Sequence, residues 1–459
     1  MEAAVKPASN PLTKAALYIA VAGLAVAAAG WAGRDWQEQA SRQQKSDEPA
    51  AFAYGPKDFA SALQQASDAV ALGTERIERR PGDWTYQESY ARALMGRARL
   101  TMSFDDLSRA DKALQLGMSQ APYRSGPLLT AAVNNMTIHH MAPVREELRL
   151  LLASAVPPET EDKAEAIAIG GDIDFYSGRY GQALKAYNDA ARLDNGPGVA
   201  VRMANWYRKA GRFDDANTQL DYAVASNRAP GRQFYANILL QKGVTALVSG
   251  DWDGAASYFS EADKVFPGYW LIKAHSAQMM AASGDIKGAE RAYLAILAHA
   301  GEPVAMPEVM DALAALYRTK GDAARSRAWA TRAGTIWSRR LAALPEAAYG
   351  HVLEHELVLG DPAKALQLAY RNMASRPYGD SAIMLGWALL ANGKPLDAAR
   401  TMEGLNRTEY QTAQQYVVLT QAMEMLGRSD DSDKARQRAL DLNPRAFDPG
   451  ASFIWFGNH

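Results

Sequence analysis

The sequence contains no cysteine, and this absence excludes several kinds of site. A chain without thiols forms no disulfide bond and offers no thiolate ligand to zinc or to an iron–sulfur cluster. The absence of cysteine does not identify the cellular compartment, because proteins without disulfides occur on both sides of a membrane.

An excess of charge of either sign is also missing. The 459 residues include 50 basic and 51 acidic side chains, which gives a formal net charge of −1. Such a balance provides no overall attraction to nucleic acid, so no nucleic-acid partner is expected. The 48% hydrophobic and 22% charged shares are typical of a folded protein. Because the chain is longer than one compact core needs, several domains or a repeat array are expected.

Motifs that carry chemistry are scarce. The sequence has no Walker-type phosphate loop, no G-x-S-x-G elbow and no G-x-G-x-x-G fingerprint. The strongest candidate is HVLEH, which runs from His351 to His355 and matches the H-x-x-E-H pattern of one metallopeptidase class. Two histidines four residues apart share a helical face and can bind a metal, with Glu354 as a base.

A structural interpretation of HVLEH is favoured over this metal-dependent hydrolase. No third protein ligand is identifiable, and the motif falls within a repeat, where its side chains would be groove or surface residues. His139 and His140 are adjacent, so on a helix they would point to different faces and chelate poorly. No catalytic residue, bound metal, cofactor or small-molecule substrate is therefore expected.

One long uncharged run lies near the N-terminus. Residues 15–33 carry no charge and lie between Lys14 and Arg34. As a helix rising about 1.5 Å per residue the run would span about 28 Å, close to the ~30 Å of a hydrocarbon core. Trp31 and Trp36 lie at its far end, as suits a membrane interface. We expect a tail at 1–14, a transmembrane helix or signal anchor at 15–33 and a polar linker at 34–57.

Two alternatives to an anchor stay open. A signal peptide cleaved near residues 27–29 has the required basic and small residues. A soluble first helix is less favoured, because the run has no amphipathic stripe. Basic residues are nearly balanced on the two sides of the run, so they leave the orientation undecided. We expect the bulk of the chain on the extracytoplasmic (periplasmic) side, as is common for short-tailed anchors.

A short motif recurs through the rest of the chain. It consists of a glycine, a polar turn and a small residue five positions later. It reads GRYGQA at Gly178, GRFDDA at Gly211, GDWDGA at Gly250, GDIKGA at Gly284, GDAARS at Gly321, GDPAKA at Gly360, GKPLDA at Gly393 and GRSDDS at Gly427. The spacings are 33, 39, 34, 37, 39, 33 and 34 residues. Glycine adopts the left-handed conformation that ends one helix, and the small residue lets the next helix pack closely.

Amphipathic stripes flank each motif. After Gly250, Ala255, Phe259 and Ala262 lie on one helical face, and Pro267 ends that helix. The repeating unit is therefore a helix, a turn, a second helix and a stop.

This unit resembles the tetratricopeptide repeat (TPR). The matching positions are small residues in the first helix (Gly171, Ala204, Gly243, Ala277, Ala314, Gly386), later aromatics (Tyr207, Tyr317), second-helix aromatics (Tyr187, Phe259, Tyr293), small residues after them (Ala190, Ala262) and terminal prolines (Pro267, Pro377, Pro444). The resemblance covers residues 159–446. Residues 58–158 match less well, with Asp105 at the turn position and a further helix pair around 127–153. An all-α, right-handed superhelical solenoid of nine to ten hairpins is expected.

The resemblance implies that the first helix of each unit lines a concave groove that binds a protein or peptide. Its exposed first-helix positions are Arg202, Asn205, Arg208, His275, Gln278, Arg318, Trp387 and Gln421. The first three lie at helical spacing, where arginine and asparagine donors can hold a carboxylate or a backbone carbonyl. The alternative is that they are solvated polar positions, because the Lys–Asn–Lys clamp of some family members is not evident.

The C-terminal tail, residues 447–459, contains four apolar residues in a row. These are Phe453, Ile454, Trp455 and Phe456. Terminal repeats normally need a polar cap, so the tail is expected to cover the last helix pair. Otherwise it is an aromatic anchor for a partner or for the membrane.

These patterns predict a membrane-tethered scaffold or assembly factor of the cell envelope. Its partner would be a protein or peptide held in the groove. The alternatives are the metal-dependent hydrolase and a cytoplasm-facing adaptor with the same groove.

Overall fold

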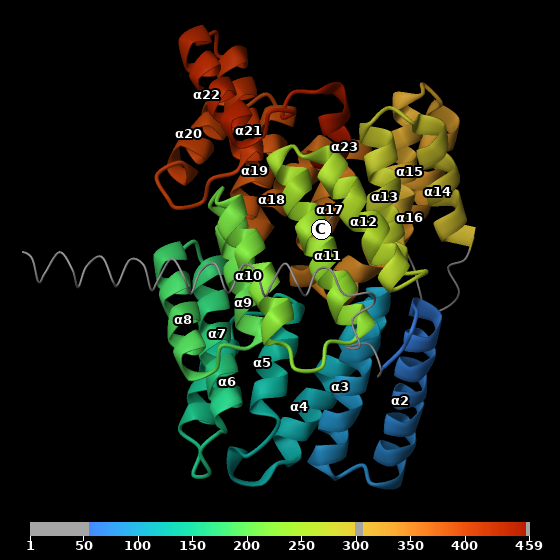
Figure 1. The fold of residues 1–459 in the computed structure, drawn as a ribbon, viewed down its shortest axis with the longest axis vertical. Coiled ribbons are helices and arrows are strands. Elements are labelled where there is room, and N and C mark those ends of the chain that lie inside the picture. The colour runs from blue at the N-terminus through green and yellow to red at the C-terminus, as the bar shows by residue number, and fades with distance from the viewer. Residues whose placement is uncertain (1–54, 299–305, 456–459) are drawn as a thin grey trace, which may run out of the picture. The chain divides into compact units, whose positions relative to one another are not determined.

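Helical hairpins make up the described chain (Figure 1). The computed structural model describes residues 55–298 and 306–455, which contain 22 α-helices and no strand. The expected anchor at 15–33, and Phe456 of the tail, lie outside these residues. Within the two described stretches, no helix combines the length and apolar character needed to cross a membrane.

The helices pair in sequence order. The leading helix α2 (Phe59–Arg79) packs on α3. The hairpins are α3 (Trp84–Thr101) with α4 (Phe104–Gln120), α5 (Leu128–Thr137) with α6 (Val144–Leu152), α7 (Thr160–Tyr176) with α8 (Tyr180–Leu193), α9 (Pro197–Lys209) with α10 (Phe213–Ser226), α11 (Arg232–Ser249) with α12 (Trp252–Val265), α13 (Trp270–Ala282) with α14 (Ile286–Ala298), α15 (Pro307–Thr319) with α16 (Ala323–Ala343), α17 (Pro345–Leu359) with α18 (Pro362–Ser375), α19 (Gly379–Ala391) with α20 (Pro395–Leu405) and α21 (Ala413–Met425) with α22 (Ser429–Leu442). A 3-10 turn (Pro449–Ala451) and α23 (Ser452–Trp455) follow. The ten hairpins of the described residues agree with the nine to ten expected.

Small residues let the two helices of a hairpin approach. Gly243 in α11 faces the ring of Phe259 in α12, and a Cβ built on it would lie 2.3 Å from that ring. Seven of the eight turn glycines have φ between +67° and +90°, the left-handed conformation that the motif predicts. Gly360 is the exception, with φ −121°, and α18 begins two residues later at Pro362.

Two expectations about the upstream region need correction. The left-handed turn residue of the α3–α4 hairpin is Met102, with φ +52°, whereas Asp105 lies in the first turn of α4. His139 and His140 follow α5 and do not lie on a helix, and His139 has φ +59°. The helix pair expected around residues 127–153 is present as α5 and α6.

Hairpins that are five apart in the sequence touch one another. The Trp270 Nε1–H of α13 donates to the Leu100 carbonyl of α3 at 2.9 Å. The Lys209 ammonium of α9 pairs with Asp380 of α19 at 2.8 Å, and the Lys209 carbonyl accepts from the Gln411 N–H at 2.8 Å. The array therefore coils so tightly that successive turns pack together. The first helices consequently line an interior with partly open cavities in place of the single concave groove that the repeat pattern predicts.

Candidate ligand-binding interior

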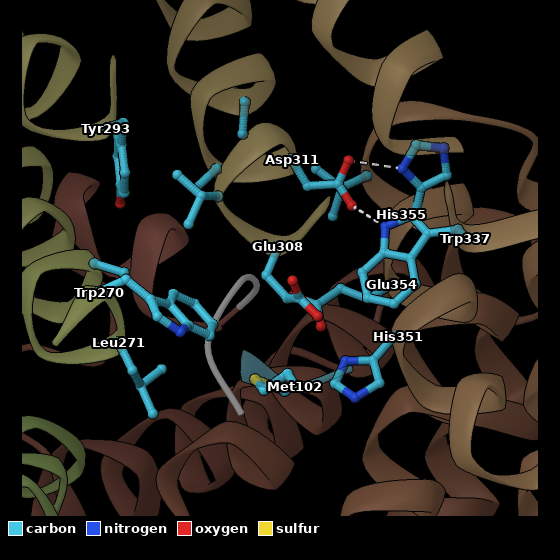
Figure 2. A pocket seen from close by; sticks show the side chains of 15 residues that line it. Met102, Trp270, Leu271, Tyr293, Glu308, Asp311, Trp337, His351, Glu354 and His355 are labelled. Atoms are coloured by element: carbon cyan, nitrogen blue, oxygen red, sulfur yellow. Dashed lines mark hydrogen bonds and ion pairs between the residues drawn. The ribbon is translucent and has the colours of Figure 1, made fainter. Parts of the chain in front are cut away.

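Three adjoining cavities lie along the inner surface. The acidic pocket, of about 60 Å³, is lined by Glu308, Asp311, Glu354, His351 and His355 together with aromatic residues (Figure 2). The side cavity, of about 420 Å³, is bounded by α15, α17, α19, α21 and Phe453. The cationic cavity, also of about 420 Å³, is lined mainly by α9, α11, α13, α17 and α19, with Arg376, Ile454 and Trp455.

Asp311 organises one side of the acidic pocket. It accepts a hydrogen bond from Trp337 Nε1 at 2.7 Å, and its other oxygen lies 2.8 Å from His355 Nδ1, as Figure 2 shows. The His351 ring stacks on the Trp337 ring, with 5.2 Å between the centroids. Burial raises the pKa of Asp311, and the neighbouring His355 opposes that shift.

Glu308 forms the other side of the pocket. It pairs with Arg340, whose guanidinium also donates to the Met102 carbonyl at 3.3 Å and so joins α16 to the first hairpin. Burial raises the pKa of Glu308, while Arg340 opposes the shift. Figure 2 shows the Glu308 and Glu354 side chains directed into the cavity, which has room for a few water molecules.

The HVLEH motif does not assemble a metal centre in this arrangement. His355 is directed to Asp311, while His351 stacks on Trp337. Across the part of the chain that the structure describes, no three His, Cys, Asp or Glu residues lie together as a metal site requires. His355 and Glu354 are expected from the sequence to be groove or surface residues. They line a pocket of the inner surface but are buried, because α15 and α16 pack over this face of α17.

The cationic cavity contains two arginines whose acceptors are neutral. Arg208 donates to Gln241 Oε1 at 2.8 Å and to Asn205 Oδ1 at 2.9 Å. Arg376, only 6% exposed, donates to Asn372 Oδ1 at 2.9 Å. Neither guanidinium pairs with a carboxylate of the described residues. Burial lowers the pKa of Arg208 from its usual value.

Asp380 is the one carboxylate among the described residues that line this cavity. It pairs with Lys209 at 2.8 Å and accepts a hydrogen bond from the Tyr410 hydroxyl. Asp380 also acts electrostatically on Arg208, so three cations of this cavity, Arg208, Lys209 and Arg376, share one carboxylate.

The C-terminal helix α23 borders two of the cavities. Gln278 Nε2 of α13 donates to the Phe453 carbonyl at 2.7 Å, and Gln414 Nε2 of α21 donates to the Trp455 carbonyl at 3.1 Å. Phe453 lines the side cavity, while Trp455 lines the cationic cavity. The tail is expected from the sequence to cover the last helix pair. It touches that pair through Gln414 but packs mainly on α13.

The eight residues expected to line a groove are distributed over this interior. Asn205, Arg208, His275 and Gln278 line the cationic cavity, and Arg318, Trp387 and Gln421 line the side cavity. Arg202 lines neither, because it forms ion pairs with Glu165 and Asp172. The expected exposure is wrong for His275 and Gln278, which are 4% and 1% exposed. The coiling of the array covers them.

The sequence pattern does not indicate several residues of the interior. Arg376 lies in the connection between α18 and α19, and Asp380 lies at the start of α19. Only the contact between α9 and α19 places them beside Arg208. The sequence does give a weak indication of Glu308 and Asp311. These two carboxylates lie three residues apart on a first helix that is otherwise rich in small and apolar side chains.

The hairpins and their glycine–aromatic packing define the class, a helical-repeat protein with a TPR-like fold. No protein-family model matches the chain, and no curated protein matches its sequence. Three solved structures are similar to it at 14% identity. The APC/C hetero-tetramer Cut9-Hcn1 gives a TM-score of 0.40 over 92% of this chain and 80% of that chain. A tetratricopeptide repeat protein from Parabacteroides merdae gives 0.34 over 56% and 96%, and yeast Tom70 gives 0.35 over 85% and 92%.

Proposed function

We propose that this protein is a scaffold whose inner surface holds a segment of a partner protein. The observation that carries the proposal is that the same surface already holds a peptide segment, its own α23. Gln278 and Gln414 donate to two backbone carbonyls of that segment. Backbone carbonyls are common to all peptides, so amide donors of this kind suit peptide recognition, with adjoining cavities selecting side chains.

The side cavity is the place where a partner segment would enter. Its volume of about 420 Å³ lies beside Phe453, and Arg318, Ala391 and Gln421 on its wall are exposed. A segment there would extend the peptide-holding surface from α13 along α15, α17, α19 and α21. Apolar wall residues such as Leu390 and Met425 would cover its side chains.

We further propose that residues 15–33 tether the scaffold to a membrane, with the repeats on the extracytoplasmic side as part of an envelope complex. The support is the uncharged run itself and the tryptophans at its end. Deleting residues 15–33 should move the protein from the membrane fraction to the soluble fraction. A reporter enzyme that works only outside the cytoplasm should be active when it is fused at residue 57. Activity of a reporter that works only inside the cytoplasm would instead favour the cytoplasm-facing adaptor.

Crosslinking and affinity purification from the native membrane test the scaffold. Ala391→Trp with Gln421→Trp fills the side cavity from two exposed positions, so the fold should be retained. Lys434→Trp adds similar bulk on the outer helix α22, where its side chain is 77% exposed, and serves as the matched control. The double variant should lose the partner that the wild type and the control recover. A partner retained by the double variant would place the binding surface elsewhere.

A further inference from the structure

We infer that the cationic cavity binds an organic anion, a molecule or side chain with a carboxylate head and an apolar body. The site consists of Arg208, Arg376 and His275 around a partly open cavity of about 420 Å³. The inference goes beyond the proposed scaffold function, because it assigns a second cavity and the chemical class of its ligand.

Other arginines of low exposure pair with carboxylates, unlike these two. Arg97 pairs with Asp106 at 2.7 Å, and Arg202 pairs with Asp172 at 2.8 Å. A charge that leaves water is stable only when an opposite charge or a full set of acceptors replaces the solvent. Within the described chain, Arg208 and Arg376 donate only to amide oxygens, and Arg376 also lies over the Tyr176 and Tyr378 rings. An anion in the cavity between them would supply the missing charge.

Unused hydrogen-bonding atoms point to the same space. Arg376 Nε is buried and has no hydrogen-bond partner in the described structure. His275, which is 4% exposed and stacks on Phe259, likewise has an unpartnered Nδ1. Buried polar atoms of this kind are rare in native proteins unless a water or a ligand satisfies them. Both residues line the cavity, so these unused atoms lie beside the proposed ligand.

His275 and His139, two of the histidines that line the cavity, add no positive charge at neutral pH. Burial lowers the pKa of His275 to about 4. Burial and the nearby Arg376 together lower the pKa of His139, which also lines the cavity, to about 3. Lys209 and Asp380 cancel one another. The positive charge available to a ligand therefore comes from the two guanidinium groups.

The walls define the rest of the ligand. Leu240, Val244, Leu271 and Met384 supply apolar surface, and Trp455 adds an aromatic ring. A volume of about 420 Å³ falls within the ~300–1,000 Å³ of small-molecule sites. The planar guanidinium fork matches a carboxylate with two parallel hydrogen bonds. A carboxylate on an aliphatic or aromatic body fits these features, whether it is a free metabolite or an acidic side chain of a partner.

Calorimetric titration of the full-length protein with 3-phenylpropionate tests the site, with 3-phenylpropionamide as the uncharged analogue. The carboxylate should bind and raise the melting temperature, and the amide should do neither. Arg208→Gln and Arg376→Gln should each weaken binding at least tenfold. Arg212→Gln, a change of the same kind in an exposed arginine paired with Asp215, should leave binding unchanged.

The melting temperature of the unliganded variants separates a ligand site from a structural role. If the arginines serve a ligand, removing an uncompensated charge should leave the melting temperature unchanged or raise it. A lower melting temperature combined with unchanged binding would overturn the inference, as would equal binding of acid and amide or no binding of either.

A second titration distinguishes the two sources of the carboxylate. The probes are acetyl-Phe-Glu-amide and acetyl-Phe-Gln-amide, which differ only in the side-chain charge. Binding of the glutamate peptide and of 3-phenylpropionate, each lost in Arg208→Gln, would support a site open to both sources. Glutamate-peptide binding alone would assign the site to a partner, and phenylpropionate binding alone to a free metabolite. Failure of the crosslinking experiment on the scaffold affects neither titration.

Discussion

The Gln278 side chain donates a hydrogen bond to the carbonyl of Phe453, 175 residues further along the chain. The bond connects the middle of the repeat array to its C-terminal helix. It also means that the inner surface, expected to receive a partner, is partly occupied by the chain itself.

Displacing α23 should cost stability. Gly450 lies so close to α13 that an added Cβ would come 2.0 Å from the Ala282 carbonyl oxygen. Gly450→Ala should therefore lower the free energy of unfolding by about 1–3 kcal/mol, measured by urea denaturation. Gly404→Ala, where no atom lies within 4 Å, is the control and should be neutral or stabilising by up to ~1 kcal/mol. Equal behaviour of the two variants would show that the 3-10 turn before α23 does not pack on α13.

Hairpin packing can be tested in the same way at Gly243. An alanine there would meet the fully buried ring of Phe259, so Gly243→Ala should cost about 1–3 kcal/mol. Gly96→Ala, in the open part of α3, should stabilise by about 0.5–1 kcal/mol because it lowers the backbone entropy of the unfolded chain. A Gly243→Ala variant as stable as the wild type would contradict the close approach of α11 and α12.

Arg202 should be structural. Arg202→Met leaves Asp172 and Glu165 without their cation and should cost about 2–3 kcal/mol at pH 7. Burial already raises the pKa of Asp172, and losing Arg202 would raise it further. The folded variant then binds more protons than the unfolded chain, so its stability increases as the pH falls toward the ordinary aspartate value. The deficit relative to the wild type should shrink between pH 7 and pH 4.5, and a constant deficit would count against this account.

His355 provides the test of the hydrolase alternative. Because it is buried against Asp311, His355→Ala should lower the free energy of unfolding by about 1–3 kcal/mol and leave the metal content at background. Denaturation and elemental analysis of the purified protein measure the two quantities. Stoichiometric zinc in the wild type, lost on substitution, would restore HVLEH as a metal site.

The sequence alone determined the hairpins, because each depends on local features. A glycine at the turn and a small residue five positions later recur within the eight units from α7 to α22, and the resulting helices lie where the pattern placed them. Met102 escaped this reasoning because a non-glycine residue adopts the left-handed conformation without a compositional signal.

Only the tertiary structure decided what the interior contains. Arg208 and Arg376 come together because hairpins five apart pack against each other, as the Lys209–Asp380 pair records. That packing depends on the superhelical pitch, which is the sum of small rotations between neighbouring hairpins. The sequence of a single unit does not determine this sum. First-helix residues that the sequence pattern predicts to be exposed therefore line partly open cavities in the structure.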